Sequence, residues 1–224
     1  MEAGFRPIVY DRWGYGASDP RPGLDIHSFE VDIEDLSALL DHLGLSRATL
    51  VGHSDGGTLA LYFAAAHPQR VTCLVTIAAH VYVEPKMRAA IWSIRQTYED
   101  DAEFRQRFRR AHGDKYQQVF DNWFYGWVKP ENLIWDMRPL LRQITCPVLV
   151  IQGSEDEDAS PQHARDIAAG IPGAELWLAP GAGHMLPRQA ARDFNHRLVE
   201  FLSKADQRQL AMDNGPQQSV ASRL

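Results

Sequence analysis

The order of strand-like and helix-like runs is the feature of this sequence that most constrains its fold. Five runs of apolar and β-branched residues have the length and composition of strands: Arg6–Asp11, Ala48–His53, Val71–Ala79, Pro147–Gly153 and Glu175–Pro180. Several of them are almost continuously apolar, as strands covered on both faces require. Because helix-like stretches alternate with them, the sequence predicts an α/β fold with a mostly parallel sheet and helices on both faces.

The expected helices have recognisable ends. Apolar residues recur at helical spacing before Gly44, which is a typical stop: Ile33, Leu36, Leu39, Leu40 and Leu43. Ser160 followed by proline indicates a cap and a first helical position, and Gly170 marks the end of that helix. A last helix is expected over about 188–204.

Residues 81–140 interrupt this alternation with a polar, helical pattern that holds 12 of the 22 aromatic residues. They form either a small bundle with its own aromatic core or a lid over the carboxyl ends of the strands. We favour a lid, because ligand-binding loops of parallel sheets emerge at those ends. The expected organisation is therefore a core of residues 1–80 and 141–204, a helical cap at 81–140 and a disordered tail at 205–224.

A glycine-rich turn follows the second strand-like run. Gly52 to Gly57 has the glycine spacing of a phosphate-binding loop, but Thr58 stands where that loop needs lysine. The residues Gly52–Gly56 instead match G-x-S-x-G, in which a serine on a sharp strand-to-helix turn is exposed as a nucleophile. The alternatives are a nucleophilic Ser54 and a plain glycine-rich loop.

A serine nucleophile needs a base, and the base needs an orienting acid. Asp156 lies three residues past the glycine that ends one strand, and His184 lies in a glycine-rich loop past the next strand. Asp158 and Glu157 are rivals for the acid, but Asp156 is favoured by its distance from the strand end. His53 flanks the serine and is interpreted as structural.

Composition excludes several classes of function. The formal net charge is −6 without a basic tract, which argues against nucleic acid as a partner. The longest apolar runs are too short to span a membrane, and the N-terminus lacks a secretory pattern. Cys73 and Cys146 lie in strand-like runs, as buried free thiols of a cytoplasmic protein would. They belong to no His/Cys cluster, so no metal site is expected.

Four motifs together resemble the α/β-hydrolase family between Phe5 and Leu202: "YDRWGYGASD", "LVGHSDGG", "CPVLVIQGSEDED" and "PGAGHMLP". The resemblance implies Ser54 as nucleophile, Asp156 as acid, His184 as base, a cap at 81–140, a small-molecule acyl substrate and no cofactor. Members that are haloalkane dehalogenases or epoxide hydrolases carry aspartate at the position of Ser54. Esters, thioesters, amides and carbon–carbon bonds are all cleaved within the family, and no oligomeric state is indicated.

The chain departs from the family at its start. Members have three more strands before "RPIVYD", and a loop after the third supplies one oxyanion donor; the backbone N–H of Asp55 supplies the other. We expect the protein to begin upstream of Met1, and Arg6–Asp11 either to pair directly with Ala48–His53 or to leave an open edge. The predicted function is a serine hydrolase of a small ester or related acyl substrate. The alternative is a weak or inactive hydrolase-like binding protein.

The carboxylate of Asp55 has two possible roles. It either borders the pocket and favours a cationic substrate, or it caps the helix that follows Ser54, where it would also meet the helix dipole. We favour the role as a cap.

Overall fold

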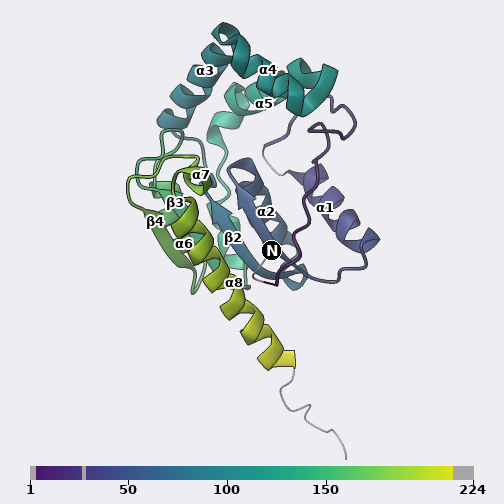
Figure 1. Cartoon of the computed structure of the whole chain (residues 1–224), viewed down its shortest axis with the longest axis vertical. Coiled ribbons are helices and arrows are strands. Elements are labelled where there is room, and N and C mark those ends of the chain that lie inside the picture. The colour runs from purple at the N-terminus through teal and green to yellow at the C-terminus, as the bar shows by residue number, and fades with distance from the viewer. Residues whose placement is uncertain (1–3, 27–28, 214–224) are drawn as a thin grey trace, which may run out of the picture.

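Four parallel strands form a single sheet in this computed structural model, which describes residues 4–26 and 29–213. The strands occur in the sheet in chain order: β1 (Ala48–His53), β2 (Val71–Ile77), β3 (Val148–Gly153) and β4 (Glu175–Ala179). Each strand pairs in parallel with the next (Figure 1). The α/β class predicted from the sequence is confirmed, and four of the five expected strands form.

Helices cover both faces of the sheet because the strands are apolar on both sides. Val75 and Leu149 belong to one cluster, which includes Phe194 and Phe201 of α8 (Ala191–Asp213). The neighbouring Leu74 and Val148 point the other way, into a larger cluster with the helices α2 (Asp55–Ala66) and α6 (Gln162–Gly170). This alternation along β2 and β3 places a buried core on either side of the sheet.

The predicted helix ends agree with the structure to different degrees. α1 (Glu30–His42) ends two residues before Gly44, whose φ is +68°. α6 begins at Gln162, one residue later than expected, because the backbone N–H and hydroxyl of Ser160 donate to Glu84 instead of capping the helix. The expected last helix is divided into a short α7 (Leu186–Gln189) and the long α8.

The prediction of a strand at Arg6–Asp11 is wrong. This segment has no regular structure and does not pair with β1, and Val9 is 92% exposed. A strand needs a neighbour to bond its backbone, and within residues 4–26 and 29–213 the outer side of β1 carries no strand. The edge is therefore open, the second of the two expected outcomes, and Val51 on β1 is 48% exposed.

Three helices occupy most of residues 81–140: α3 (Pro85–Asp100), α4 (Ala102–His112) and α5 (Tyr116–Val128). They form a layer at the top of Figure 1, beyond one end of the strands. Much of their aromatic content packs internally, as the stacking of Tyr98 on Phe120 at 3.8 Å shows. Short 3-10 turns at Pro130–Ile134 and Arg138–Gln143 lead back to β3.

The C-terminal helix extends further than expected. α8 continues to Asp213, so residues 205–213, which were expected to be disordered, are helical. The rest of the expected tail lies outside the described residues. Among the helices that the structure describes, none has both the length and the apolar character needed to cross a membrane.

Candidate active site

Ser54 sits on a strained turn between β1 and α2. Its φ of 54° and ψ of −125° lie outside the regions that L-residues favour, and its N–H donates to Ile77 O at 2.8 Å. The turn is so tight that a Cβ on Gly52 would lie 2.2 Å from Gly56 O. Glycine is therefore required before the serine, and the serine side chain is lifted away from the sheet as the motif predicts.

The structure brings Ser54, His184 and Asp156 together. The Nε2 atom of His184 lies 3.1 Å from Ser54 Oγ, and its Nδ1 atom lies 3.1 Å from each carboxylate oxygen of Asp156. Asp156 Oδ1 also accepts the backbone N–H groups of Asp158 at 2.9 Å and Ala159 at 3.0 Å. These bonds hold the buried carboxylate toward the imidazole.

The two rival carboxylates have other positions. Glu157 Oε2 accepts the backbone N–H of His184 at 2.8 Å and thus supports the loop rather than the ring. Asp158 Oδ2 is 3.8 Å from His184 Nε2, on the side of the serine. His53 Nε2 is 2.9 Å from the backbone oxygen of His184, a contact that positions the loop.

The carboxylates around His184 set its protonation. Burial disfavours the imidazolium, but the hydrogen bond and charge of Asp156, with the charges of Asp158 and Glu157, outweigh burial and raise the pKa of His184. Burial likewise opposes the charged form of Asp156. The contact with His184 and the two backbone donors outweigh it and lower the pKa of Asp156. A carboxylate thus faces a ring that readily accepts a proton, the arrangement needed by a general base.

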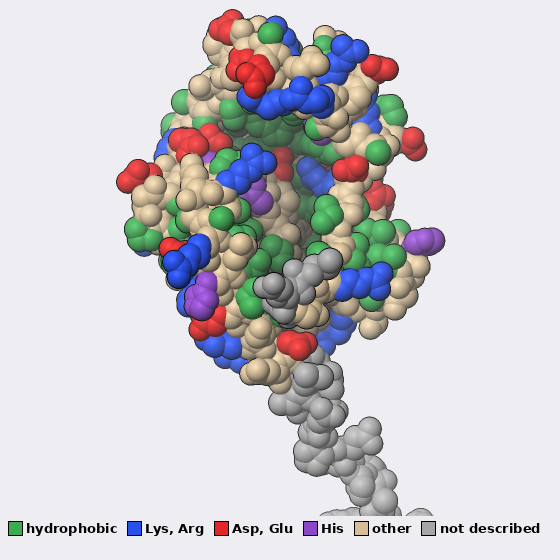
Figure 2. All heavy atoms as spheres, in the orientation of Figure 1, with side chains coloured by type: hydrophobic (Ala, Val, Ile, Leu, Met, Phe, Trp, Pro, Cys, Tyr) green, Lys and Arg blue, Asp and Glu red, His purple; other side chains and the backbone are tan. Residues whose placement is uncertain are grey.

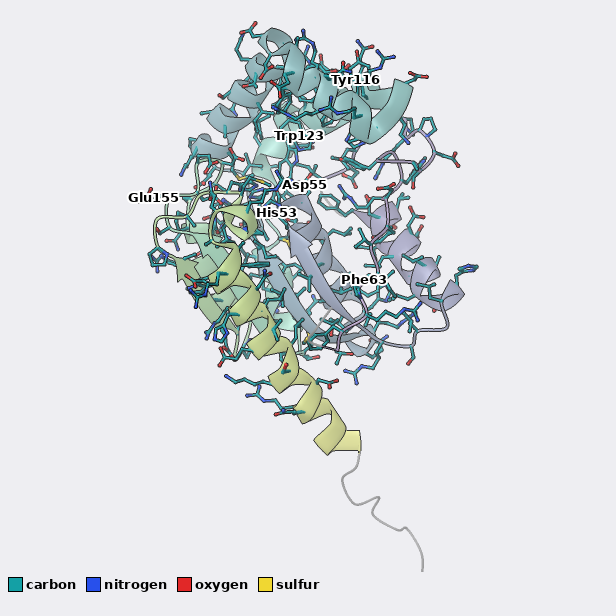
Figure 3. All side chains as sticks on the ribbon, in the orientation of Figure 1. His53, Asp55, Phe63, Tyr116, Trp123 and Glu155 are labelled. Carbon is teal, nitrogen blue, oxygen red and sulfur yellow. The ribbon has the colours of Figure 1, made fainter. Side chains whose placement is uncertain are left out.

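A pocket opens above Ser54 beneath the α3–α5 layer. Its empty volume is about 330 Å³, and its apolar wall comes from α3 and α5: Met87, Ala90, Ile91, Ile94, Trp123 and Trp127. Figure 2 shows a hollow below these helices, and Figure 3 shows His53, Asp55 and Trp123 gathered in that part of the molecule. The pocket therefore joins an apolar surface to the polar groups at the carboxyl ends of the strands.

Asp55 contributes both its backbone and its side chain to this pocket. Its N–H belongs to the first residue of α2, where a helix has no carbonyl partner for it. Burial raises the pKa of the Asp55 carboxyl, while the charge of Arg12 and a hydrogen bond with Trp127 reduce the rise. Asp55 is among the residues that line the pocket, a position that the first of its two expected roles requires.

His80 also lies at the nucleophile, and the sequence reasoning missed it. Its Nε2 atom is 3.4 Å from Ser54 Oγ, and it follows directly on the run Val71–Ala79 that contains β2. The position just past a parallel strand is the same signal that pointed to Asp156 and His184. Among the described residues, no group of three or more His, Cys, Asp or Glu side chains is placed to hold a metal ion.

Fold and site together define an α/β hydrolase, and comparison with known proteins shows the same family. Residues 2–113 match the family model for the alpha/beta hydrolase fold, and the chain belongs to this family of enzymes. It is 30% identical over 205 residues to human "Serine hydrolase BPHL", covering 88% of this chain and 69% of the relative. It is 26% identical over 225 residues to a "2-hydroxy-6-oxo-6-phenylhexa-2,4-dienoate hydrolase" of Comamonas testosteroni, covering 90% of this chain and 78% of the relative.

Solved structures give the same result. A hydrolase from Pseudomonas aeruginosa PA01 matches with a TM-score of 0.65 and 27% identity, over 86% of this chain and 78% of that one. NosK from Streptomyces actuosus matches with a TM-score of 0.74 over 91% of this chain and 88% of that one, and its 21% identity supports the fold alone. The named relatives act as hydrolases, and hydrolysis is the class of reaction assigned to this chain.

Proposed function

We propose that the protein is a serine hydrolase that cleaves a small ester or a related acyl compound through Ser54, His184 and Asp156. One observation carries this proposal: Ser54 Oγ and the Asp156 carboxylate lie 3.1 Å from opposite nitrogens of the same imidazole. Such a chain of contacts activates a hydroxyl that would otherwise be a poor nucleophile. We also assign residues 81–140 as the cap that covers a small-molecule substrate.

The first half of the reaction follows from these contacts. Ser54 Oγ attacks the substrate carbonyl carbon while His184 Nε2 takes the hydroxyl proton. Asp156 holds the other ring nitrogen as N–H and stabilises the imidazolium. The carbonyl oxygen becomes an oxyanion, to which the N–H of Asp55 donates. His184 then returns the proton to the leaving alcohol as the carbon–oxygen bond breaks, and an acyl-Ser54 remains.

The second half releases the enzyme. A water molecule gives a proton to His184 Nε2 and attacks the acyl carbon. The tetrahedral species collapses, Ser54 Oγ leaves with the proton from His184, and the carboxylic acid departs. The apolar wall from α3 and α5 suits a small acyl group, whereas one relative is named as a hydrolase of a phenyl-substituted dienoate. An ester is therefore the substrate class that we propose, and it does not follow from the relatives alone.

A fluorophosphonate probe, which reacts covalently with activated serines, tests the proposal directly. We expect labelling of the wild type, loss of labelling in Ser54→Ala and retention in Ser203→Ala, a serine of α8 that does not line the pocket. Hydrolysis of p-nitrophenyl acetate should follow the same order. Equal labelling of the wild type and Ser54→Ala, or none in a folded wild type, would refute the proposed nucleophile and favour the weak or inactive alternative.

A further inference from the structure

His80 is fixed in place by its backbone and by the rings around it. Its N–H donates to Thr58 Oγ1 at 3.0 Å, and its carbonyl oxygen accepts the same hydroxyl at 2.8 Å. The ring meets Trp127 edge to face with centroids 5.7 Å apart. It lies parallel to the ring of His184, with centroids 6.0 Å apart and planes 6° apart. A side chain that is only 6% exposed and held in this way has a defined orientation.

Two parallel imidazoles therefore flank one hydroxyl. Ser54 Oγ is 3.1 Å from His184 Nε2 and 3.4 Å from His80 Nε2. A serine hydroxyl has one proton and two lone pairs. Because Asp156 keeps the proton of His184 on Nδ1, His184 Nε2 is the acceptor for the hydroxyl proton. The serine lone pairs are then available to His80, which has to donate from Nε2 to form a bond.

The surroundings of the other ring nitrogen favour this tautomer. In residues 4–26 and 29–213, His80 Nδ1 is buried without a hydrogen-bond partner. A proton on Nδ1 would be a buried N–H without an acceptor, which is rarer in proteins than an under-used acceptor. A proton on Nε2 instead points to Ser54. Burial, together with the nearby His163 and His184, also lowers the pKa of His80 well below its ordinary value, so the ring stays neutral.

We propose that His80 is a further catalytic residue, whose Nε2–H donates to Ser54 Oγ before attack and to the substrate carbonyl oxygen as negative charge develops there. The inference rests on the proposed function of Ser54. No proton is transferred by His80: His184 still takes and returns the proton, and His80 supplies a neutral donor. Histidine side chains are among the groups that form oxyanion holes. His80 would thus act beside the N–H of Asp55.

Three substitutions of His80 separate this role from packing. Glutamine places an amide N–H near the position of Nε2, asparagine places one near Nδ1, and leucine removes the donor. We expect His80→Asn and His80→Leu to lower kcat for p-nitrophenyl acetate by about 10²–10³, the usual effect of losing one oxyanion donor, with KM little changed. His80→Gln should stay within about tenfold of the wild type. Thermal unfolding of each variant reports whether it is folded.

The outcomes are distinct. Unchanged kcat in His80→Asn and His80→Leu, or equal losses in the Gln and Asn variants, would overturn the role of His80 while Ser54 dependence remains. Equal turnover by the wild type and Ser54→Ala would refute the proposed function itself, and the role of His80 with it. Nitrogen-15 NMR of the histidine-labelled wild type is independent of activity. It should show the Nε2–H tautomer of His80, and an Nδ1–H tautomer would refute the inference.

Discussion

The backbone strain at Ser54 predicts that the protein is more stable with glycine than with alanine at this position. The φ of 54° and ψ of −125° at this serine form a conformation that is accessible to glycine and costly for residues with a Cβ. Ser54→Ala removes the hydroxyl but keeps the Cβ, whereas Ser54→Gly removes both. The difference between these two variants therefore isolates the backbone strain from the loss of the contacts with His184 and His80.

The expected size of this difference follows from two opposing contributions. A residue held in a sparsely populated region costs roughly 1–3 kcal/mol, which glycine would recover. Glycine also increases the entropy of the unfolded chain, which lowers the free energy of unfolding by about 0.4–1 kcal/mol relative to alanine. The free energy of unfolding of Ser54→Gly should therefore be about 1 kcal/mol higher than that of Ser54→Ala. This corresponds to a Tm about 2–4 °C higher for a chain of this size.

Urea unfolding and thermal unfolding, followed by circular dichroism, measure this difference. Equal m-values in the two variants would show that their free energies of unfolding are comparable. Both variants should lack fluorophosphonate labelling. If Ser54→Gly is no more stable than Ser54→Ala, the turn does not store strain at this residue, and the account of a serine held on a costly turn fails.

Three more predictions concern groups around the serine. Asp158→Asn removes a negative charge 3.8 Å from His184 Nε2, so the pKa of His184 should fall. The acidic limb of the kcat/KM profile should then move to lower pH, and a limb that keeps its position or moves to higher pH would contradict this. Asp55→Asn should lower the preference for an α-amino ester over its des-amino analogue by about fivefold, the effect of roughly 1 kcal/mol; an unchanged ratio leaves Asp55 only a role at the helix terminus. Gly52→Ala places a Cβ 2.2 Å from Gly56 O and should lower the free energy of unfolding by more than about 2 kcal/mol. Gly56→Ala is its control, since that Cβ meets nothing within 4 Å, and it should raise the free energy of unfolding by about 0.4–1 kcal/mol rather than lower it.

The parts of the fold that the sequence predicts well are those with a local cause. The glycines around Ser54 encode a turn within a few residues, and the apolar runs β2 and β3 encode buried strands. The segment Arg6–Asp11 has the same kind of local pattern, but its conformation depends on a neighbouring strand. A strand is stabilised by backbone bonds to a partner, and residue type alone does not supply one. This is why the same pattern led to a correct prediction at β2 and a wrong one at Arg6–Asp11.

The site residues follow from a rule about where the strands end, and that rule was applied incompletely to the sequence. In a parallel sheet the carboxyl ends of all strands meet at one edge, and each of the four strands here delivers a group to that edge: Ser54, His80, Asp156 and His184. The expectation of a catalytic triad used this rule for three strands and passed over the one between Ser54 and Asp156. Applied to β2 as well, the rule selects His80, the histidine that follows directly on its strand-like run. Two hydrogen bonds between the His80 backbone and the hydroxyl of Thr58 on α2 then help to explain why the His80 ring is held against the serine.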